Sequence, residues 1–583
     1  RERGVARLAT HWDPICRVDV VGDENADDAL RVYQDGDAPT WIPSKDKPDD
    51  QFVSSHLALA YMMKFAPDAA KRDKALVIGV GGGHDIRTAL VMGATRVLGA
   101  EINESTAAMM RERFDAYSGG LYTDPRVEIV VADGRSVVAR SDETFDVIQI
   151  TGADTYAALA SGANLVAESY LYTSDALDDY LSHLNDEGVL AVLRWRFRPP
   201  RETLRLVGMA ALALKRAGAA DPSRHIAVIN VDSKGNLFGG TEVQARYAVT
   251  LVKKTPFTDG ERGLLRRFCK EHPTGHYSVA YLPGDPGEPE FEGYLSAIQE
   301  GPAAQRAFED AYAYAIDPVS DDRPFFFQFF RGRDVVSERE EERGKEHFFS
   351  VIGGGPAGLQ VLWYSMGAAL ILVVLLVLAP LAVLRRDGLR VPGGGRLVVF
   401  FVAVGLAYLM VEIATMQRLT LYLGHPLFAL SLGLTTFLVA SGLGAAASAR
   451  VAAGGERRGA TIGAVLVVVM LAFHAFAVPS ILEATLHLST VARCALAVVL
   501  IAPLAFFMGF PFPLGLRRAR AQDPRLLPWA FGVNGGASVI ASVLAILFAM
   551  DHGFSAVLVF GAALYATAAI TLPASARAGA TPS

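Results

Sequence analysis

A group of glycines between two apolar runs gives the first chemical signal in this sequence. The run Leu76–Ile78 is followed by four glycines, Gly79, Gly81, Gly82 and Gly83. A helical pattern starts at Asp85, and a second apolar run ends at Glu101, at about the distance of 20 residues that a dinucleotide fingerprint has. In such a unit the glycine turn approaches a ligand closely and the acid binds ribose hydroxyls. The spacing predicts a nucleoside-cofactor site; the alternative is a glycine-rich turn beside a solvated glutamate.

Two further strand ends carry polar residues that fit the same site. Asp133 and Gly134 follow a third apolar run, and the loop Thr151–Tyr156 follows a fourth. Ligands of doubly wound sheets bind at the carboxyl ends of the strands, so these residues belong at one edge of the sheet. Asp133 could accept a hydrogen bond from an adenine amino group, although an Asp-Gly pair is also a common turn.

The elements that must position these residues alternate between strands and helices. Four strands, each followed by a helical pattern, are expected at Ala75–Val80, Arg96–Ala100, Val127–Val131 and Phe145–Ile150. Later strands are expected at Gly188–Phe197, His225–Asn230 and Tyr247–Val252, and a helix at Gly260–Glu271. Before them, Arg17–Ile42 reads as a small antiparallel unit and Ser54–Phe65 as a helix. The alternation predicts an α/β fold with a doubly wound, mostly parallel sheet.

The second half of the chain has a different composition. From Leu359 to Ser583 there are 14 arginines, no lysines and 6 acidic residues, which leaves 41 basic and 55 acidic residues in the first 358. Seven apolar runs are long enough to cross a bilayer. We expect the spans at Leu359–Leu384, Leu397–Met416, Pro426–Ala447, Gly459–Val478, Val491–Phe510, Pro528–Met550 and Gly553–Leu572. The sequence therefore predicts an all-α transmembrane bundle embedded in a lipid bilayer, in a multi-pass protein of a bacterial inner membrane.

The distribution of arginines does not decide on which side of the membrane the soluble half lies. The loops after the first, third and fifth spans are rich in arginine, and the positive-inside rule places such loops in the cytoplasm. The soluble half would then lie outside, away from a cytosolic cofactor. A miscounted span or a failure of the rule is the interpretation we favour; a soluble half that uses no cytosolic cofactor is the alternative.

Three polar residues fall within or near the spans. Glu412 is costly in hydrocarbon, so we expect it to face the bundle interior, as an interhelical clamp or as the lining of a substrate or proton path. His474 and Asn534 are expected to make hydrogen bonds between helices, and the segment Ser441–Ser448 to form a small-residue packing face.

Composition excludes several classes of function. The cysteines Cys16, Cys269 and Cys494 have no spacing typical of a disulfide framework or a zinc site, and no metal is expected. No run of basic residues with interleaved aromatics suggests nucleic-acid binding. Because the chain opens with Arg1 and has no signal peptide, we expect that an upstream portion is missing. The expected domains are 1–73, 74–330 and 359–575, with a charged and glycine-rich linker at 331–358, and a homo-oligomer is an open expectation.

The block LVIGVGGGHDIR, GAEINES, PRVEIVVADGR and FDVIQITGADTYAA resembles the polyamine aminopropyltransferases, the spermidine synthase family. The resemblance covers roughly Val18 to Val252. It implies the fold of S-adenosylmethionine-dependent methyltransferases and the binding of decarboxylated S-adenosylmethionine or S-adenosylmethionine. The matching cofactor positions are Gly79, Gly81, Gly83, Glu101, Asp133 and Gly134. With its membrane half, the chain looks like the membrane-fused, spermidine-synthase-like proteins of bacteria.

The chain departs from the family in the substrate pocket. Where the family has Asp-x-x-Asp-Pro, this chain has Thr151 in place of the first acid and keeps only the second, Asp154. Gly82 replaces a family aspartate that contacts substrate amines. Asp154 is the candidate catalytic base or amine anchor. His56, His84, Asp85 and Tyr156 are further candidates for the pocket, with helix capping as the alternative for Asp85.

These features predict a transferase that moves an aminopropyl or methyl group from a sulfonium to a small-molecule amine or another nucleophile. One alternative is a methyltransferase that acts on a membrane-borne acceptor. The other is a non-catalytic transporter or sensor with a degenerate synthase domain. A diamine pocket needs two or more acids, whereas a lipid acceptor needs an apolar mouth.

Overall fold

The computed structural model describes residues 6–13, 15–23, 30–63, 73–153, 169–238, 241–271, 276–330 and 357–573. The chain separates into two compact units, residues 1–359 and 360–583, which we call the soluble unit and the membrane unit.

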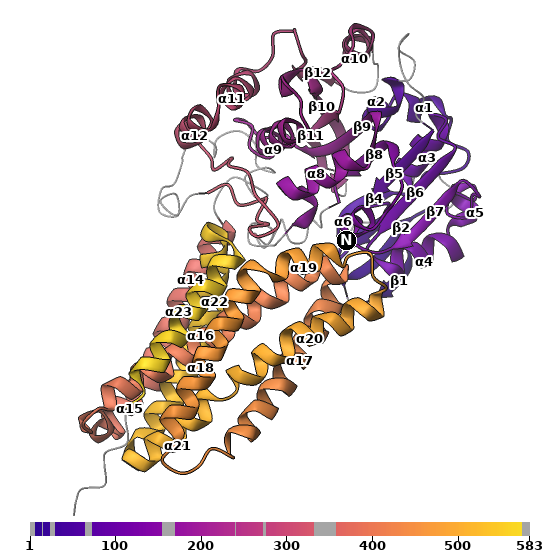
Figure 1. Cartoon of the computed structure of the whole chain (residues 1–583). Coiled ribbons are helices and arrows are strands. Elements are labelled where there is room, and N and C mark those ends of the chain that lie inside the picture. Colours follow the sequence, from indigo (N-terminus) through magenta and orange to yellow (C-terminus); the bar gives the residue numbers. More distant parts are fainter. Residues whose placement is uncertain are drawn as a thin grey trace, which may run out of the picture. The chain divides into compact units, whose positions relative to one another are not determined.

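The soluble unit is built on an eight-stranded sheet (Figure 1). Its strands are β5 (Lys74–Ile78), β6 (Arg96–Glu101), β7 (Val127–Val131), β8 (Phe145–Thr151), β9 (Leu184–Trp195), β10 (Ile226–Phe238), β11 (Thr241–Lys253) and β12 (His276–Tyr281). The order is β12-β10-β11-β9-β8-β5-β6-β7. Strands β5 to β9 pair in parallel, and β11 lies antiparallel between β9 and β10. This confirms the predicted doubly wound α/β fold.

The central strands are buried on both faces. Ala75, Leu76, Val77 and Ile78 of β5 are each at most 2% exposed. A continuous apolar run of this kind is typical of a strand covered by helices on both sides. The helices of the first units are α3 (His84–Val91), α4 (Glu104–Glu112), α5 (Asp115–Ser118) and α6 (Gly134–Ala139), followed later by α8 (Ser174–Ser182), α9 (Glu202–Arg216), α10 (Asp259–Glu271), α11 (Pro289–Glu300) and α12 (Pro302–Ala311).

A separate four-stranded antiparallel sheet precedes this fold. It contains β1 (Ala6–Trp12), β2 (Arg17–Gly22), β3 (Arg31–Gln34) and β4 (Asp37–Trp41), in that order. Asp35 and Gly36, with φ of 51° and 78°, make the tight turn between β3 and β4. The predicted antiparallel unit is therefore present, and it gains one strand, β1, at its edge.

The predicted helix Ser54–Phe65 is corrected by the structure. After α1 (Asp50–Val53), a 3-10 turn η1 (His56–Ala58) leads into the short helix α2 (Leu59–Met62). Ser55 is extended and its hydroxyl accepts a hydrogen bond from Leu57 N, so the helical segment starts at a cap rather than at residue 54. Residues 64 and 65 lie outside the described residues.

The described part of the membrane unit contains seven helical segments long and apolar enough to cross a membrane. They comprise α14 (Ala357–Val373) continued through a π-turn into α15 (Ala379–Leu384), α16 (Gly394–Leu423), α17 (Pro426–Ser448), α18 (Glu456–Phe476), α20 (Thr490–Met508) continued by α21 (Pro511–Gln522), α22 (Leu527–His552) and α23 (Phe554–Thr571). A short helix, α19 (Val478–Ala484), follows α18. These segments match the seven expected spans.

Helix α16 lies at the centre of the membrane unit. It packs against α17, α20, α21, α22 and α23. Closest approach between helices occurs at small residues: a Cβ on Gly444 of α17 would lie 1.8 Å from the Phe506 carbonyl oxygen of α20. The predicted small-residue packing face at Ser441–Ser448 is thus present.

Hydrogen bonds between helices occur where the sequence placed them. Asn534 Nδ2 donates to the Phe401 carbonyl at 3.0 Å, which joins α22 to α16. His474 Nε2 lies 3.1 Å from the Leu500 carbonyl, which joins α18 to α20. Both residues link helices, as predicted.

Candidate functional site

The site lies where the chain reverses direction across the sheet. From β5 the chain proceeds to β6 and β7 on one side, and it then returns to β8 on the other side of β5. Open α/β sheets bind ligands at such a switch point, beyond the carboxyl ends of the strands. The glycine turn follows β5 and Thr151 ends β8, so both lie at this position.

The glycine turn is held against the small N-terminal sheet. Gly79, Gly81 and Gly83 have φ of 81°, 53° and 92°, a region that favours glycine. Position 82 requires glycine because of space rather than backbone conformation. A Cβ there would lie 2.2 Å from the Trp41 carbonyl oxygen of β4. In this chain the backbone of β4 therefore leaves no space for a side chain at position 82.

Glu101 is anchored at the end of β6 by the turn itself. Its Oε2 accepts a hydrogen bond from Gly81 N at 2.9 Å, and its Oε1 accepts one from Asn103 N at 3.0 Å. The residue is 3% exposed, and burial raises the pKa of its carboxyl, which these backbone donors partly offset. Each oxygen can accept one more hydrogen bond. The predicted pair of glycine turn and acid is thus brought together.

Asp133 caps a helix. Its Oδ1 accepts a hydrogen bond from Ser136 N at 2.9 Å at the start of α6. A Cβ on Gly134 would lie 2.3 Å from Ile78 Cγ2, so this turn packs directly on the end of β5. Asp133 and Gly134 thus start a helix rather than form a separate turn, and this start lies beside the strand that precedes the glycines.

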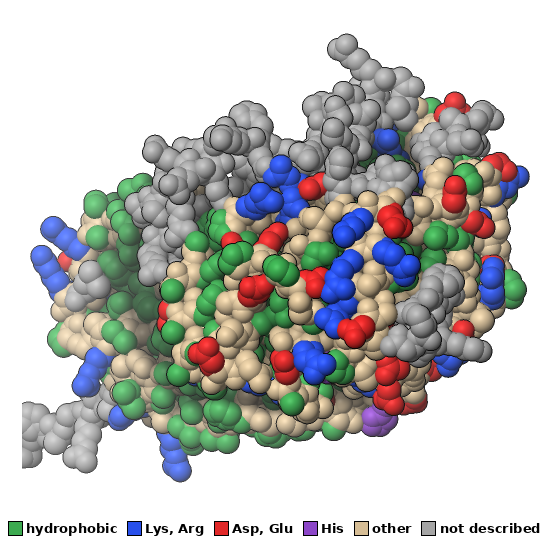
Figure 2. Space-filling view, turned by 90° about the horizontal axis from the view of Figure 1, so that it is seen from above, with side chains coloured by type: hydrophobic (Ala, Val, Ile, Leu, Met, Phe, Trp, Pro, Cys, Tyr) green, Lys and Arg blue, Asp and Glu red, His purple; other side chains and the backbone are tan. Residues whose placement is uncertain are grey.

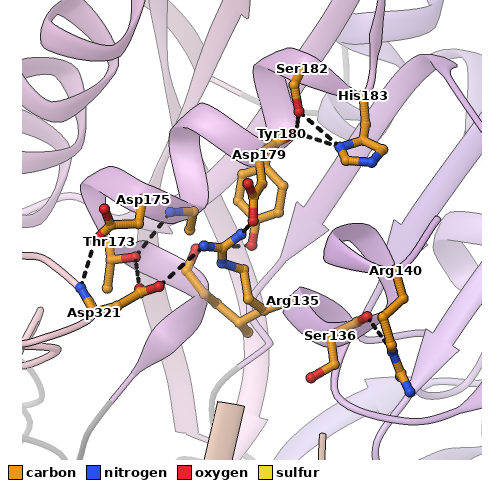
Figure 3. A network of polar contacts seen from close by, with 12 residues as sticks. Arg135, Ser136, Arg140, Thr173, Asp175, Asp179, Tyr180, Ser182, His183 and Asp321 are labelled. Atoms are coloured by element: carbon orange, nitrogen blue, oxygen red, sulfur yellow. Dashed lines mark hydrogen bonds and ion pairs between the residues drawn. The ribbon is translucent and has the colours of Figure 1, made fainter. Parts of the chain in front are cut away.

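Arg135 ties this turn to two distant segments (Figure 3). Its guanidinium is ion-paired with Asp179 of α8 and, at 3.3 Å, with Asp321. Asp321 also accepts a hydrogen bond from Thr173 Oγ1 at 2.6 Å, and Thr173 caps α8. Arg135 is only 3% exposed. This network fixes the turn that contains Asp133, and the sequence offered no sign of it beyond an arginine after Asp-Gly.

Asp85 and Thr151 meet at the switch point. Thr151 Oγ1 and Gln149 Nε2 each donate to Asp85 Oδ1 at 2.6 Å. Burial raises the pKa of Asp85 to about 6, against the opposing effect of these hydrogen bonds. A carboxylate from α3 is therefore hydrogen-bonded to the residue that replaces the family aspartate. Capping alone does not describe Asp85, because its side chain points to β8.

His84 and Tyr61 lie next to Asp85, and His56 lies near His84. His84 starts α3 and its ring lies 5.1 Å from that of Phe52. Desolvation, with a smaller contribution from nearby His84, lowers the pKa of His56 to about 4, so the imidazole is neutral at pH 7. Tyr61 of α2 is fully buried, its hydroxyl has no hydrogen-bond partner among the described residues, and it interacts electrostatically with Asp85.

Of the predicted pocket, the structure thus brings Asp85 together with Thr151, and His56 together with His84. The predicted base Asp154 and the candidate Tyr156 lie outside the described residues. Sequence reasoning missed Gln149 and Tyr61. The signal for Gln149 was an amide within the apolar strand FDVIQIT; Tyr61 gave none, because an aromatic residue in a helix usually packs in a core.

Basic and acidic side chains are interspersed over the face of the molecule in Figure 2. Among the residues that the structure describes, no group of three or more histidine, cysteine, aspartate or glutamate side chains could hold a metal ion.

Fold and site together define a doubly wound α/β domain with a candidate ligand site at the switch point of its sheet. Comparison with known proteins shows which proteins this domain is similar to. The chain is 29% identical over 141 residues to the polyamine aminopropyltransferase of Sodalis glossinidius, covering 24% of this chain and 45% of that protein. It is 35% identical over 100 residues to polyamine aminopropyltransferase 1 of Pseudomonas aeruginosa, covering 17% of this chain and 34% of that protein. The chain thus spans less than half the length of these curated relatives.

Solved structures of similar proteins include the spermidine synthase of Thermotoga maritima, with 20% identity, a TM-score of 0.31, and 46% of this chain and 80% of that chain covered. A probable spermidine synthase from Corynebacterium glutamicum has 17% identity, a TM-score of 0.33, and coverage of 46% and 90%. No family model matches the chain. The protein is spermidine-synthase-like in its soluble unit, and the resemblance predicted from the glycine turn and its following acids is confirmed.

Proposed function

We propose that the soluble unit is an aminopropyltransferase-type enzyme that uses decarboxylated S-adenosylmethionine and acts on a small-molecule amine. The observation that carries the proposal is the contact between Asp85 and Thr151, which places a carboxylate beside the position where the family has one. The similarity to polyamine aminopropyltransferases supports the same class of reaction.

The residues at the switch point fit such a cofactor. Glu101 would accept hydrogen bonds from the ribose hydroxyls through the lone pairs that Gly81 N and Asn103 N leave free. The backbone of the turn at Gly79–Gly83 would lie along the sulfonium side chain. Asp133 would accept a hydrogen bond from the adenine amino group. When bound, the cofactor supplies an electrophilic carbon next to a positively charged sulfur.

Asp85 would orient and activate the amine. A carboxylate attracts the ammonium form, and it can accept the proton that the amine must lose before its nitrogen attacks. The Thr151 and Gln149 donors hold Oδ1, which leaves Oδ2 to face the substrate. Neutral His56, which lies near His84, would add an acceptor that carries no opposing charge.

The membrane half anchors this enzyme. Seven apolar helices support a multi-pass protein, for which we propose the inner membrane of a bacterium. Its sidedness is tested by a protease-labile tag at the N-terminal end, assayed for cleavage in intact cells. Protection places the soluble unit in the cytoplasm; cleavage places it outside and contradicts use of a cytosolic cofactor.

The transfer reaction is tested with the detergent-purified full chain. Decarboxylated S-adenosylmethionine is mixed with putrescine, spermidine or no amine, and the aminopropylated product is measured by mass spectrometry. In parallel, S-adenosylmethionine is offered with a bacterial lipid extract. Amine-dependent product supports the proposal. Methylation of a lipid without aminopropyl transfer would contradict it and favour the methyltransferase alternative, whereas no reaction with either cofactor would favour a non-catalytic unit.

A further inference from the structure

Helix α16 carries a line of polar residues at the centre of the membrane unit. Tyr408, Glu412 and Thr415 follow each other at intervals of four and three residues, so they lie on one face of the helix. Glu412 and Thr415 are 5% and 4% exposed. Glu412 lies 11 residues before the end of α16 at Leu423. At the usual rise of a helix, this is roughly 16 Å along the helix axis.

Glu412 lacks the partner that an interhelical clamp requires. Its Oε1 is buried without a hydrogen bond, and no charged side chain is paired with it among the described residues. The Thr415 hydroxyl is buried and unpartnered as well. A buried charge without a counter-charge is strongly unfavourable, so the clamp interpretation of Glu412 is not supported.

A second helix completes the environment of Glu412. A Cβ on Gly561 of α23 would lie 2.6 Å from Val411 Cγ2, which shows how closely α23 approaches α16 at this level. Tyr565, one turn further along α23, is fully buried with an unpartnered hydroxyl. It interacts electrostatically with both Tyr408 and Glu412. On the other side, Tyr408 Oη lies 3.0 Å from Ser441 Oγ of α17.

The basic side chains of the bundle nearest to α16 are engaged elsewhere. Arg418 donates to the His474 carbonyl at 2.7 Å and to the Ser555 hydroxyl. Arg493 donates to the Tyr422 carbonyl and to Thr490 Oγ1. No arginine of the described helices therefore neutralises Glu412. Its Oε1, the Thr415 hydroxyl and the Tyr565 hydroxyl are three buried polar groups without a partner among the described residues.

We propose that Tyr408, Glu412, Thr415 and Tyr565 form an intramembrane site that binds the ammonium group of an organic amine. A carboxylate gives a charge-assisted hydrogen bond to an ammonium, and the Thr415 and Tyr565 hydroxyls offer further acceptors. Tyrosine rings attract cations as well, most strongly where water is excluded. These four residues supply each kind of interaction that an ammonium uses.

The choice of an organic amine rests on the proposed function of the soluble unit, which would handle amines as substrate and product. The membrane unit would then bind a molecule of the same class, as expected of a path for uptake or export. The site itself rests on separate residues, so the two proposals can fail independently.

The test measures binding of radiolabelled spermidine to the full chain in lipid nanodiscs. Asp85→Asn is present throughout, because Asp85 is the proposed amine ligand of the soluble unit and its loss lowers spermidine binding there. We expect saturable binding that weakens at least tenfold with Glu412→Gln and is unchanged with Glu483→Gln, which alters an exposed carboxylate on α19. Absence of saturable binding, or binding that Glu412→Gln leaves unchanged, would overturn the inference.

Further variants keep the test decisive if Glu412→Gln fails to fold. Tyr565→Phe and Thr415→Val each remove one unpartnered hydroxyl, and we expect the double variant to weaken spermidine binding three- to tenfold. No change in that variant would overturn the assignment of these hydroxyls. Equal displacement of spermidine by the same concentration of sodium would also overturn it, because it would show a site for any cation. Loss of transferase activity alone would contradict only the proposed function.

Discussion

Buried carboxylates occur in both units, but they have opposite surroundings. In the soluble unit, Glu101 accepts two backbone hydrogen bonds and Asp85 accepts two from side chains. In the membrane unit, Glu412 is buried to a similar extent and accepts none among the described residues. Hydrogen bonds fix the first two in place before any ligand arrives, whereas the third would gain its partner only from a ligand or a proton.

The comparison distinguishes two ways of preparing an acid for function. A carboxylate with fixed donors is preorganised, and its protonation is governed by burial against those donors. A carboxylate without donors lowers the stability of the protein until a cation binds. Four substitutions test this difference, in decreasing order of expected effect.

Asp85→Asn should have the largest effect. It removes the proton acceptor but keeps the shape of the side chain, so we expect turnover to fall about 1000-fold, within the range for loss of a general base. In the unmodified chain, Asp85 is protonated below its pKa of about 6, so activity should fall as the pH drops below that value. The variant should lose this acid limb. Asp142→Asn, at an exposed position, is the control; an unchanged pH profile in Asp85→Asn would contradict the assignment.

Gly82→Asp introduces the acid that the family has at this position, but the structure leaves no space for its side chain. Its Cβ would lie 2.2 Å from the Trp41 carbonyl oxygen, so strand β4 must move. We expect the free energy of unfolding of the soluble unit to fall by about 3 kcal/mol, measured by denaturant titration. Gly263→Asp, where a Cβ meets nothing within 4 Å, should change little. A stable Gly82→Asp protein would show that β4 does not close the turn.

Arg135→Ala removes the arginine that is ion-paired with two aspartates. Asp179 and Asp321 lose their shared partner, and we expect a loss of about 2 kcal/mol in the free energy of unfolding. The matched control is Arg216→Ala, whose ion pair with Asp178 is exposed and should contribute less than about 1 kcal/mol. Equal losses in the two variants would contradict the role of the buried network.

Glu412→Leu should have the smallest effect on stability. Glu412 has no partner to lose. We therefore expect the free energy of unfolding of the membrane unit to change by less than about 1 kcal/mol, or to rise, as measured by thermal denaturation. Glu202→Leu provides the contrast, since it would leave Arg194 buried without its 2.7 Å ion pair and should be far more destabilising. A large loss in Glu412→Leu would restore the clamp interpretation.

The sequence predicted the fold well wherever local pattern determines structure. The strands β5 to β8 were placed to within two residues, because continuous apolar runs between glycines and acids identify strands buried on both faces. Edge strands β1 and β12 were missed because polar residues interrupt their apolar residues, so neither segment has a continuous apolar run. Seven spans were predicted from apolar length alone, and each matches a helical segment.

The candidate site was predictable only in part. Glu101 followed from its spacing to the glycines, because that motif places it beside the turn. The contact of Asp85 with Thr151 joins residues 66 positions apart, and no local pattern reports such a contact. The reason for Gly82 lies in the Trp41 carbonyl, which comes from another sheet. Local sequence thus identified the residue types, and tertiary packing determined their roles.

The most direct test of the account is calorimetric titration of the purified full chain with decarboxylated S-adenosylmethionine. Glu101→Ala should weaken binding about 100-fold, or ~2.7 kcal/mol, because two ribose hydrogen bonds to a charged acceptor are lost. Glu104→Ala, at an exposed position three residues away, should bind as the unmodified chain does. Failure of the unmodified chain to bind, or equal affinity in the Glu101→Ala chain, would contradict a cofactor site at the glycine turn.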